Sequence, residues 1–154
     1  GNYGIANRSG EVVIGGGGFN GTGKGYAQSS VITLTGTTTD ESTTSLFVNG
    51  NPNVTTIERS SGTVYTSFEA KVIGVRTGGT AAGSEGDRIF LTTSGIIYET
   101  TANESTPVIV STGTVTGWTA NAAFSGSNML FQVTGAADMD ISWSCTLHLY
   151  EMKV

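Results

Sequence analysis

The sequence predicts an all-β protein: an antiparallel β-sandwich of about ten strands, jelly-roll-like in order. Three observations predict it. Gly, Thr, Ser and Asn make up 73 of the 154 residues, and these residues are poor helix formers, which excludes a helical bundle. Apolar and polar residues alternate with period two in the longer segments. Clusters of Gly, Ser, Asn or Asp separate those segments, as between the strands of a sandwich.

The first thirty residues differ in composition from the rest. Residues 1–30 contain ten Gly and few bulky apolar residues, too few to form a core. Apart from one brief strand, Glu11 to Ile14, we expect a short Gly-rich stalk, intertwined or solenoid-like. Residues 4–10 laid against 21–27 suggest a loose repeat of 17 or 18 residues, and repeats of this kind bury their apolar face by stacking on neighbours. The neighbours would be other copies of the chain, or upstream sequence.

The second region, residues 31–154, is expected to form one sandwich domain, with the boundary near Ser29–Ser30. Its clearest strand is 140–152, where five apolar residues from Ile141 to Leu149 alternate with polar ones, so one face is buried and the other is wet or interfacial. A similar alternation from Val64 is broken at 73–75, and an extra residue or a bulge at Gly74 would explain the break. The expected strands are 31–36, 44–49, 54–58, 63–76, 88–93, 95–101, 107–112, 114–124, 128–134 and 140–152.

Charge and hydropathy exclude several classes of function. Only 12% of the residues are charged, while 37% are hydrophobic and the mean hydropathy is +0.02, so the chain is not disordered. A net charge of −5 offers no basis for binding nucleic acid or an anionic membrane. No apolar run approaches the ~20 residues that span a bilayer. The chain opens with Gly1 rather than Met, so we expect a fragment or a processed product.

A glycine-rich run is the most conspicuous motif. It contains Gly16-x-Gly18-x-x-Gly21 and also Gly18-x-x-x-x-Gly23-Lys24, which nearly match a dinucleotide fingerprint and a phosphate-binding loop. Both motifs need a following helix, whose N-terminus holds the phosphate. The residues after Lys24 are strand-like instead. We therefore interpret these glycines as sites of close chain packing and expect no nucleotide cofactor.

Other chemically capable residues also have structural interpretations. His148 lies on the polar face of its expected strand, and Cys145 lies on the other face, so no metal site is expected. Cys145 is the single cysteine, so no intrachain disulfide can form, and we expect it to be a small core residue. Asp138 and Asp140 would point to the same side if extended and could form an acid/base or Ca²⁺ pair, but a solvated strand entrance is favoured. Trp118 is expected in the core, with sugar stacking as the alternative.

The longest expected loop runs from Arg76 to Arg88. Its Arg76, Glu85, Asp87 and Arg88 are the candidate residues for contact with a receptor. The alternative is a flexible connection between two strands. No catalytic residue is predicted anywhere in the chain.

Several segments together resemble a known family. They are 25–40, 46–50, 68–79, Trp118, 133–135 and 141–143. The pattern resembles the C-terminal domain of tail-fibre and related virion fibre proteins of tailed bacteriophages, in which a Gly- and Ala-rich repeat similar to the head of trimeric autotransporter adhesins precedes a strand-rich domain. The similarity covers roughly residues 4–150. Only one or two irregular repeats are present here, so the extent of any stalk is not specified.

The resemblance implies a homotrimer in an extracellular virion fibre. It implies attachment to a host-surface glycan or protein and no cofactor, and it supplies no fixed catalytic motif and no binding residue. We also expect contacts with other virion proteins and no enzymatic activity. Two alternatives remain open: a structural or decoration protein of the capsid or tail without receptor binding, and a polysaccharide depolymerase.

Overall fold

The computed structural model describes residues 4–6, 8–16, 27–57, 64–98, 101–126 and 128–153, and every regular element among them is a β-strand. The strands, in chain order, are β1 (Val12–Gly16), β2 (Ala27–Thr38), β3 (Thr43–Ser45), β4 (Phe47–Val48), β5 (Val64–Gly78), β6 (Arg88–Tyr98), β7 (Thr101–Glu104), β8 (Val108–Thr112), β9 (Thr119–Ser125), β10 (Asn128–Thr134) and β11 (Asp140–Lys153).

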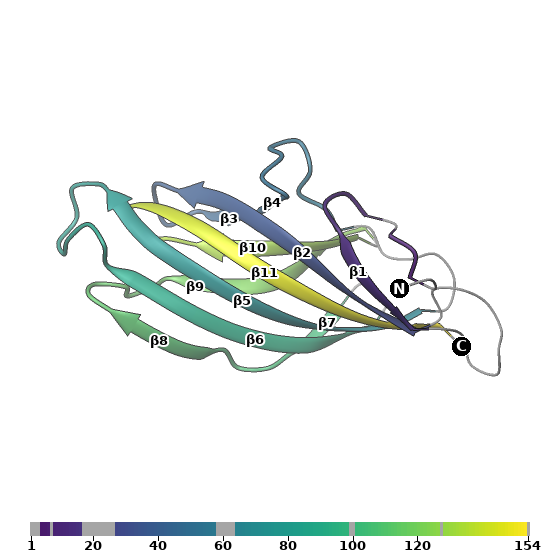
Figure 1. Cartoon of the computed structure of the whole chain (residues 1–154). Coiled ribbons are helices and arrows are strands. Elements are labelled where there is room, and N and C mark those ends of the chain that lie inside the picture. The colour runs from purple at the N-terminus through teal and green to yellow at the C-terminus, as the bar shows by residue number, and fades with distance from the viewer. Residues whose placement is uncertain are drawn as a thin grey trace.

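The strands form two sheets that share one apolar core (Figure 1). The larger has eight strands in the order β1-β2-β11-β5-β6-β7, with β4 also paired to β2 and β8 to β6. The smaller has the order β3-β10-β9, and all pairs are antiparallel. The expected all-β antiparallel sandwich is confirmed. The jelly roll that we expected is an eight-stranded fold of two Greek keys. The structure instead divides its strands into a sheet of eight and a sheet of three. The long β11 lies at the centre of the larger sheet, where it pairs along its length with both β2 and β5.

The core lies between the inward faces of the two sheets. From Ile141 to Leu149 every second side chain of β11 is buried, as the period-two alternation predicts. Trp118 is also buried, as expected, and its ring meets Trp143 edge to face with centroids 5.6 Å apart. Trp143 Nε1 donates a hydrogen bond to Thr38 Oγ1 at 2.9 Å, so the indole is fixed in both its apolar and its polar contacts.

The expected bulge at Gly74 is wrong. Gly74 keeps the inward phase of β5 and lies opposite Trp143, where a Cβ would approach the indole Cζ3 to 2.5 Å. Ile73 and Val75, on either side of Gly74, both point outward in regular register. The register of β5 against β11 shifts closer to the end of β5: Ile141 pairs with Arg76, Asp140 pairs with Gly78, and Thr77 has no pairing partner on β11. The glycine breaks the apolar pattern because it makes room for a ring from the adjacent strand.

The predicted break between 93 and 95 has the same cause. Strand β6 continues through this point without a break. Position 95 is a glycine because a Cβ there would lie 2.7 Å from the Phe68 ring on β5. The glycine therefore accommodates a side chain and does not form a turn. The strand expected at 54–58 is reduced to an isolated bridge between Ile57 and Met129, and residue 58 lies outside the described residues.

The described part of the leading region joins the large sheet. The brief strand expected at Glu11 to Ile14 is β1, and it pairs with β2 from Val12 opposite Val31 to Gly16 opposite Ala27. The expected boundary near residues 29–30 therefore falls inside β2. The second copy of the expected repeat, residues 21–27, lies outside the described residues except for its last residue.

The sandwich has two distinct ends. Strand β1 and the last residues of β11 lie at one end (Figure 1). The loops 39–42, 79–87, 113–118 and 135–139 lie at the other, because the paired ends of β2, β11, β5, β6 and β8 meet there. We call these four segments the far loops.

Candidate functional site

The outer face of the eight-stranded sheet, which points away from the three-stranded sheet, is unusually apolar. Cross-strand partners share a face, and the pairing of Ile14, Ser29, Tyr150, Ser67 and Ile96 in sequence across five strands places them all on it. By the same register, this face carries ten of the twelve exposed large apolar side chains of the described residues. The ten are Val12, Ile14, Tyr65, Ile73, Phe90, Ile96, Val108, Val110, Tyr150 and Met152.

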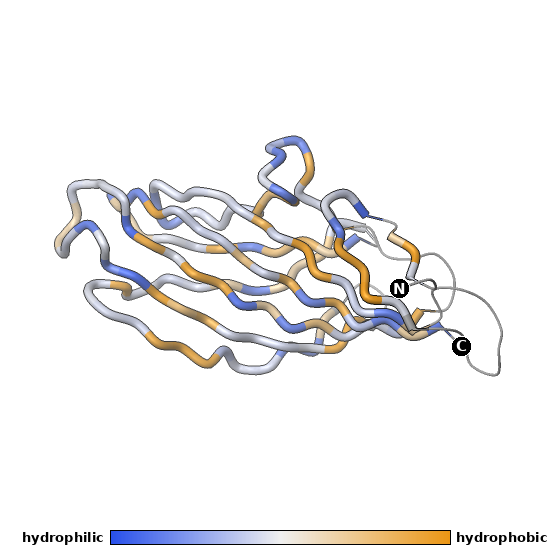
Figure 2. Tube along the Cα trace, viewed as in Figure 1, coloured by the Kyte–Doolittle hydropathy of each residue, from blue (hydrophilic) through white to orange (hydrophobic). Residues whose placement is uncertain are grey.

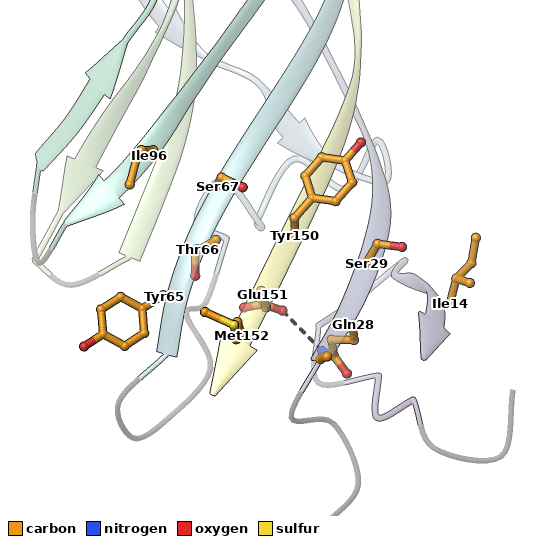
Figure 3. A pocket seen from close by; sticks show the side chains of 11 residues that line it. Ile14, Gln28, Ser29, Tyr65, Thr66, Ser67, Ile96, Tyr150, Glu151 and Met152 are labelled. Carbon is orange, nitrogen blue, oxygen red and sulfur yellow. Dashed lines mark hydrogen bonds between the residues drawn. The ribbon is translucent and has the colours of Figure 1, made fainter. Parts of the chain in front are cut away.

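Half of these side chains form a proximal patch near the chain ends. Ile14, Tyr65, Ile96, Tyr150 and Met152 line a shallow hollow of about 500 Å³. Figure 3 shows them on β1, β5, β6 and β11, with the hydroxyl of Ser29 and that of Ser67 between them. The hollow is therefore an apolar surface with a few hydroxyls.

A distal patch lies nearer the far loops. Ile73, Phe90 and Val110 form one cross-strand row and line a second hollow of about 310 Å³. Strand β8 is exposed at all five positions and apolar at 108–110. Figure 2 shows apolar segments at both sheet edges, on β1 and along β8.

A polar band separates the two patches. Lys71 Nζ lies 3.0 Å from Glu69 Oε1, and both side chains are substantially exposed, so this ion pair stabilises the fold by less than about 1 kcal/mol. His148 lies opposite Glu69 and is half-buried on the same face, which confirms the outward position expected for it. Cys145 points to the core, and burial raises the pKa of its thiol well above the ordinary value, so the sulfur is held as an unreactive thiol.

A buried ion-pair cluster ties the leading region to the last strand. Arg8 Nη1 lies 2.6 Å from Glu11 Oε1, and Arg8 Nη2 lies 2.5 Å from Glu151 Oε1, with all three side chains almost fully buried. Gln28 Nε2 also donates to Glu151 at 3.2 Å. Burial by itself lowers the pKa of Arg8, but the hydrogen bonds and charges of the two glutamates outweigh burial and raise it. The guanidinium is thus held charged.

The sequence analysis did not identify this cluster, although one signal was present. Glu151 continues the inward series Cys145, Leu147 and Leu149 by one more step of period two. A carboxylate at a buried position needs a cationic or hydrogen-bonding partner, and the chain has only seven Lys and Arg. The alternation could therefore have predicted a buried partner for Glu151, but not that the partner is Arg8.

Two of the four predicted receptor-contact residues are buried. Arg76 is 4% exposed and donates hydrogen bonds to the carbonyls of Gly78, Gly79, Ala81 and Ala82. A guanidinium that is this buried and this fully bonded cannot meet a receptor. Arg76 instead bonds to the backbone of the first half of loop 79–87.

Asp87 organises the second half of the same loop. Its Oδ2 accepts a hydrogen bond from the backbone N–H of Ser84 at 2.9 Å and lies 3.9 Å from Arg76 Nη1. The pKa of Asp87 is lowered, first by the Ser84 bond, then by a backbone bond from Thr114 and the charge of Arg76, against the opposing effect of burial. Asp87 therefore joins loop 79–87 to loop 113–118.

The other two predicted contact residues are exposed. Glu85 lies in loop 79–87, and Arg88 begins β6 on the outer face. Both stand at the end formed by the far loops and are free to reach a partner. Of the four candidates, Arg76 and Asp87 are therefore buried and hold the loop in place, whereas Glu85 and Arg88 are exposed at the surface.

The proposed carboxylate pair has a different geometry from the expected one. Asp138 is exposed and adopts a left-handed backbone conformation with φ of 56°, so the segment before β11 is not extended at this point and the period-two argument does not apply to it. Asp138 O accepts a hydrogen bond from Ala81 N at 3.1 Å, which connects two of the far loops. This agrees with the favoured interpretation of a strand entrance.

The glycine-rich run precedes a strand. Residues 17–26 of the phosphate-binding candidates lie outside the described residues, and from Ala27 the chain forms β2. The helix N-terminus that both motifs require is therefore replaced by an extended backbone from that residue onward.

In the part of the chain that the structure describes, no three His, Cys, Asp or Glu side chains are grouped so that they could hold a metal ion. The same residues form no helix that is long and apolar enough to cross a membrane. Comparison with protein-family models, with curated proteins and with solved structures gives no match for the chain.

Proposed function

We propose that this chain is a non-enzymatic, homotrimeric domain of a virion fibre of a tailed bacteriophage, that it contacts other virion proteins, and that it attaches the particle to a glycan or protein on the host surface. The observation that carries the proposal is that the two ends of the sandwich differ. The described ends of the chain lie at one end, and the far loops, held in place by Arg76 and Asp87, lie at the other.

A rigid loop surface favours attachment for a thermodynamic reason. A loop that is already ordered loses little conformational entropy when it binds. In loop 79–87 the hydrogen bonds that order the backbone come from within the protein, which leaves Glu85 and neighbouring exposed residues for a partner. Three such surfaces on one trimer would raise the overall affinity through effective concentration, even where each site is weak.

Binding to bacterial cells tests the attachment function. The fluorescently labelled protein is mixed with a panel of bacterial strains, and bound label is measured by flow cytometry. We expect binding to some strains, a decrease for Glu85→Lys, and no decrease for Asn53→Lys, which places the same charged residue on an exposed loop away from the far loops.

The possible results separate the proposal from its structural alternative. A protein that remains trimeric and folded but binds no strain would contradict attachment and favour a capsid or tail structural role. Equal loss of binding in both variants would contradict the placement of the receptor surface at the far loops.

A further inference from the structure

We infer that the outer face of the eight-stranded sheet is the surface through which copies of this chain contact one another, with the proximal and distal patches buried in that contact. The occupant is a second copy of the chain. This inference deepens the proposed function and rests on its homotrimer, because it assigns the surface that forms the assembly.

The first argument is the amount of apolar surface. The ten apolar side chains of the outer face are between 42% and 68% exposed. At about half of the roughly 100 Å² that a Val, Ile or Met side chain can bury, and about half of the roughly 200 Å² of an aromatic side chain, they present on the order of 600 Å², comparable with the about 800 Å² per partner of a stable interface. The proximal and distal patches are separated by the polar band, and together they match or exceed the about 300–600 Å² of the largest apolar patch on a typical monomer.

The second argument is the distribution of charge. Copies of a chain with net charge −5 repel one another, so a self-contact needs a region from which the acidic groups are absent. Among the described residues, the exposed acids are Asp40, Glu41, Glu85, Asp138 and Asp140, and all five lie at the end of the far loops. Away from that end, the strand pairing of the described residues places two charged side chains on the outer face. These are Glu69 and Lys71, which form an ion pair and neutralise each other. The described residues of this face therefore oppose the approach of a second copy with little like-charge repulsion.

The third argument concerns the two edges of the sheet. Strands β1 and β8 lie at opposite edges, each has five residues, and neither contains a charged side chain. Such edges promote association unless a charge, a proline or a covering element protects them. Val12 and Ile14 project from β1 onto the outer face, and Val108 and Val110 project onto it from β8. A neighbouring copy on this face would cover the apolar side chains of both edges.

The chain offers a matched pair of variants for the test. Ile96 and Ile109 are exposed isoleucines on strands of the same sheet, 62% and 53% exposed respectively. Ile96 pairs with Ser67 on the outer face, whereas Ile109 pairs with the buried Leu91 and projects to the opposite face. Ile96→Lys and Ile109→Lys introduce the same charge, but only the first introduces it into the inferred interface. Ile73→Lys provides a second outer-face variant, in the distal patch.

The experiment measures the solution mass of the full chain by light scattering and sedimentation over a range of concentrations, with circular dichroism as a check on folding. We expect the wild-type mass to be near three times 15.8 kDa. Ile96→Lys and Ile73→Lys should each weaken assembly at least tenfold in concentration, and Ile109→Lys should leave it within about twofold, because a lysine in an apolar contact must be desolvated.

Three results would overturn the inference, and they distinguish it from the proposed function. A monomeric wild-type protein at all concentrations would overturn both the homotrimer and the interface. A wild-type trimer that persists in folded Ile96→Lys and Ile73→Lys would overturn only the assignment of the surface. A trimer lost in folded Ile109→Lys and retained in Ile96→Lys would place the contact on the opposite side of the sheet.

Discussion

Gly74 lies directly opposite Trp143 on the adjacent strand, and the indole ring occupies the space that a side chain at position 74 would need. The ring also packs against Trp118 and bonds to Thr38. These contacts leave the indole little freedom to move away. The absence of a side chain at position 74 of β5 therefore leaves the space that the Trp143 ring occupies.

The first prediction concerns this contact. Gly74→Ala should lower the free energy of unfolding by about 1–3 kcal/mol, because it overpacks a well-filled core. Denaturant titration measures the change. If the methyl–indole clash is the cause, Gly74→Ala should lose much less stability in a Trp143→Leu background, and additive effects of the two substitutions would contradict this explanation.

The second prediction concerns Arg76. Arg76→Lys should destabilise the protein by about 1–3 kcal/mol, because a lysine keeps the charge but cannot reach four carbonyls with a planar fork, and some of these part-buried carbonyls then lose their donors. Hydrogen exchange in residues 79–87 should become faster. Arg88→Lys, at an exposed position, should change stability by less than about 0.5 kcal/mol. Unchanged exchange in Arg76→Lys would show that the loop is held by other contacts.

The third prediction concerns pH. Because the pKa of Asp87 is lowered in the folded protein, its carboxylate contributes stability that is fully present above the ordinary carboxyl pKa of about 4 and is lost as the pH falls through the lowered folded value. The difference in unfolding free energy between wild type and Asp87→Asn, measured from pH 7 to pH 2, should be constant down to about pH 5 and then shrink. A difference that does not depend on pH would contradict the assignment.

The fourth prediction concerns the buried ion pair. Glu151→Gln should cost about 3–5 kcal/mol, the usual effect of removing one partner from a buried pair. It should also accelerate hydrogen exchange in β1, since Arg8 and Glu151 connect the leading region to β11. As the control, Glu69→Gln breaks an exposed pair and should cost less than about 1 kcal/mol. Equal effects of the two substitutions would mean that burial of Arg8 is not what stabilises the contact.

The fifth prediction concerns Cys145. Burial raises the pKa of its thiol, and the thiolate is the reactive form. A thiol-specific reagent at neutral pH should therefore leave the native protein unmodified over the time in which it labels the denatured chain completely. Rapid labelling without denaturant would contradict the placement of Cys145 in the core.

The alternation of residue types was sufficient to predict most of the strands and which side chains of β11 face inward. This pattern is local, because neighbouring side chains on an extended backbone point to opposite sides whatever the rest of the chain does. Composition likewise excluded helices, and the expected strands 107–112 and 128–134 appear within one residue as β8 and β10. The sequence by itself thus determined the fold class, the core face of the last strand and the outward position of His148.

The tertiary structure alone decided the roles of the residues that break the pattern. Gly74 and Gly95 looked like interruptions, and they are strand residues opposite the rings of Trp143 and Phe68. Arg76 looked like a surface charge and is buried under the loop that it holds. In each case the partner comes from another strand or from the backbone of a folded loop, so no local pattern contains it. The apolar outer face depends in the same way on strand order, because Val12 and Val110 come to one side only after β1 and β8 have joined the same sheet.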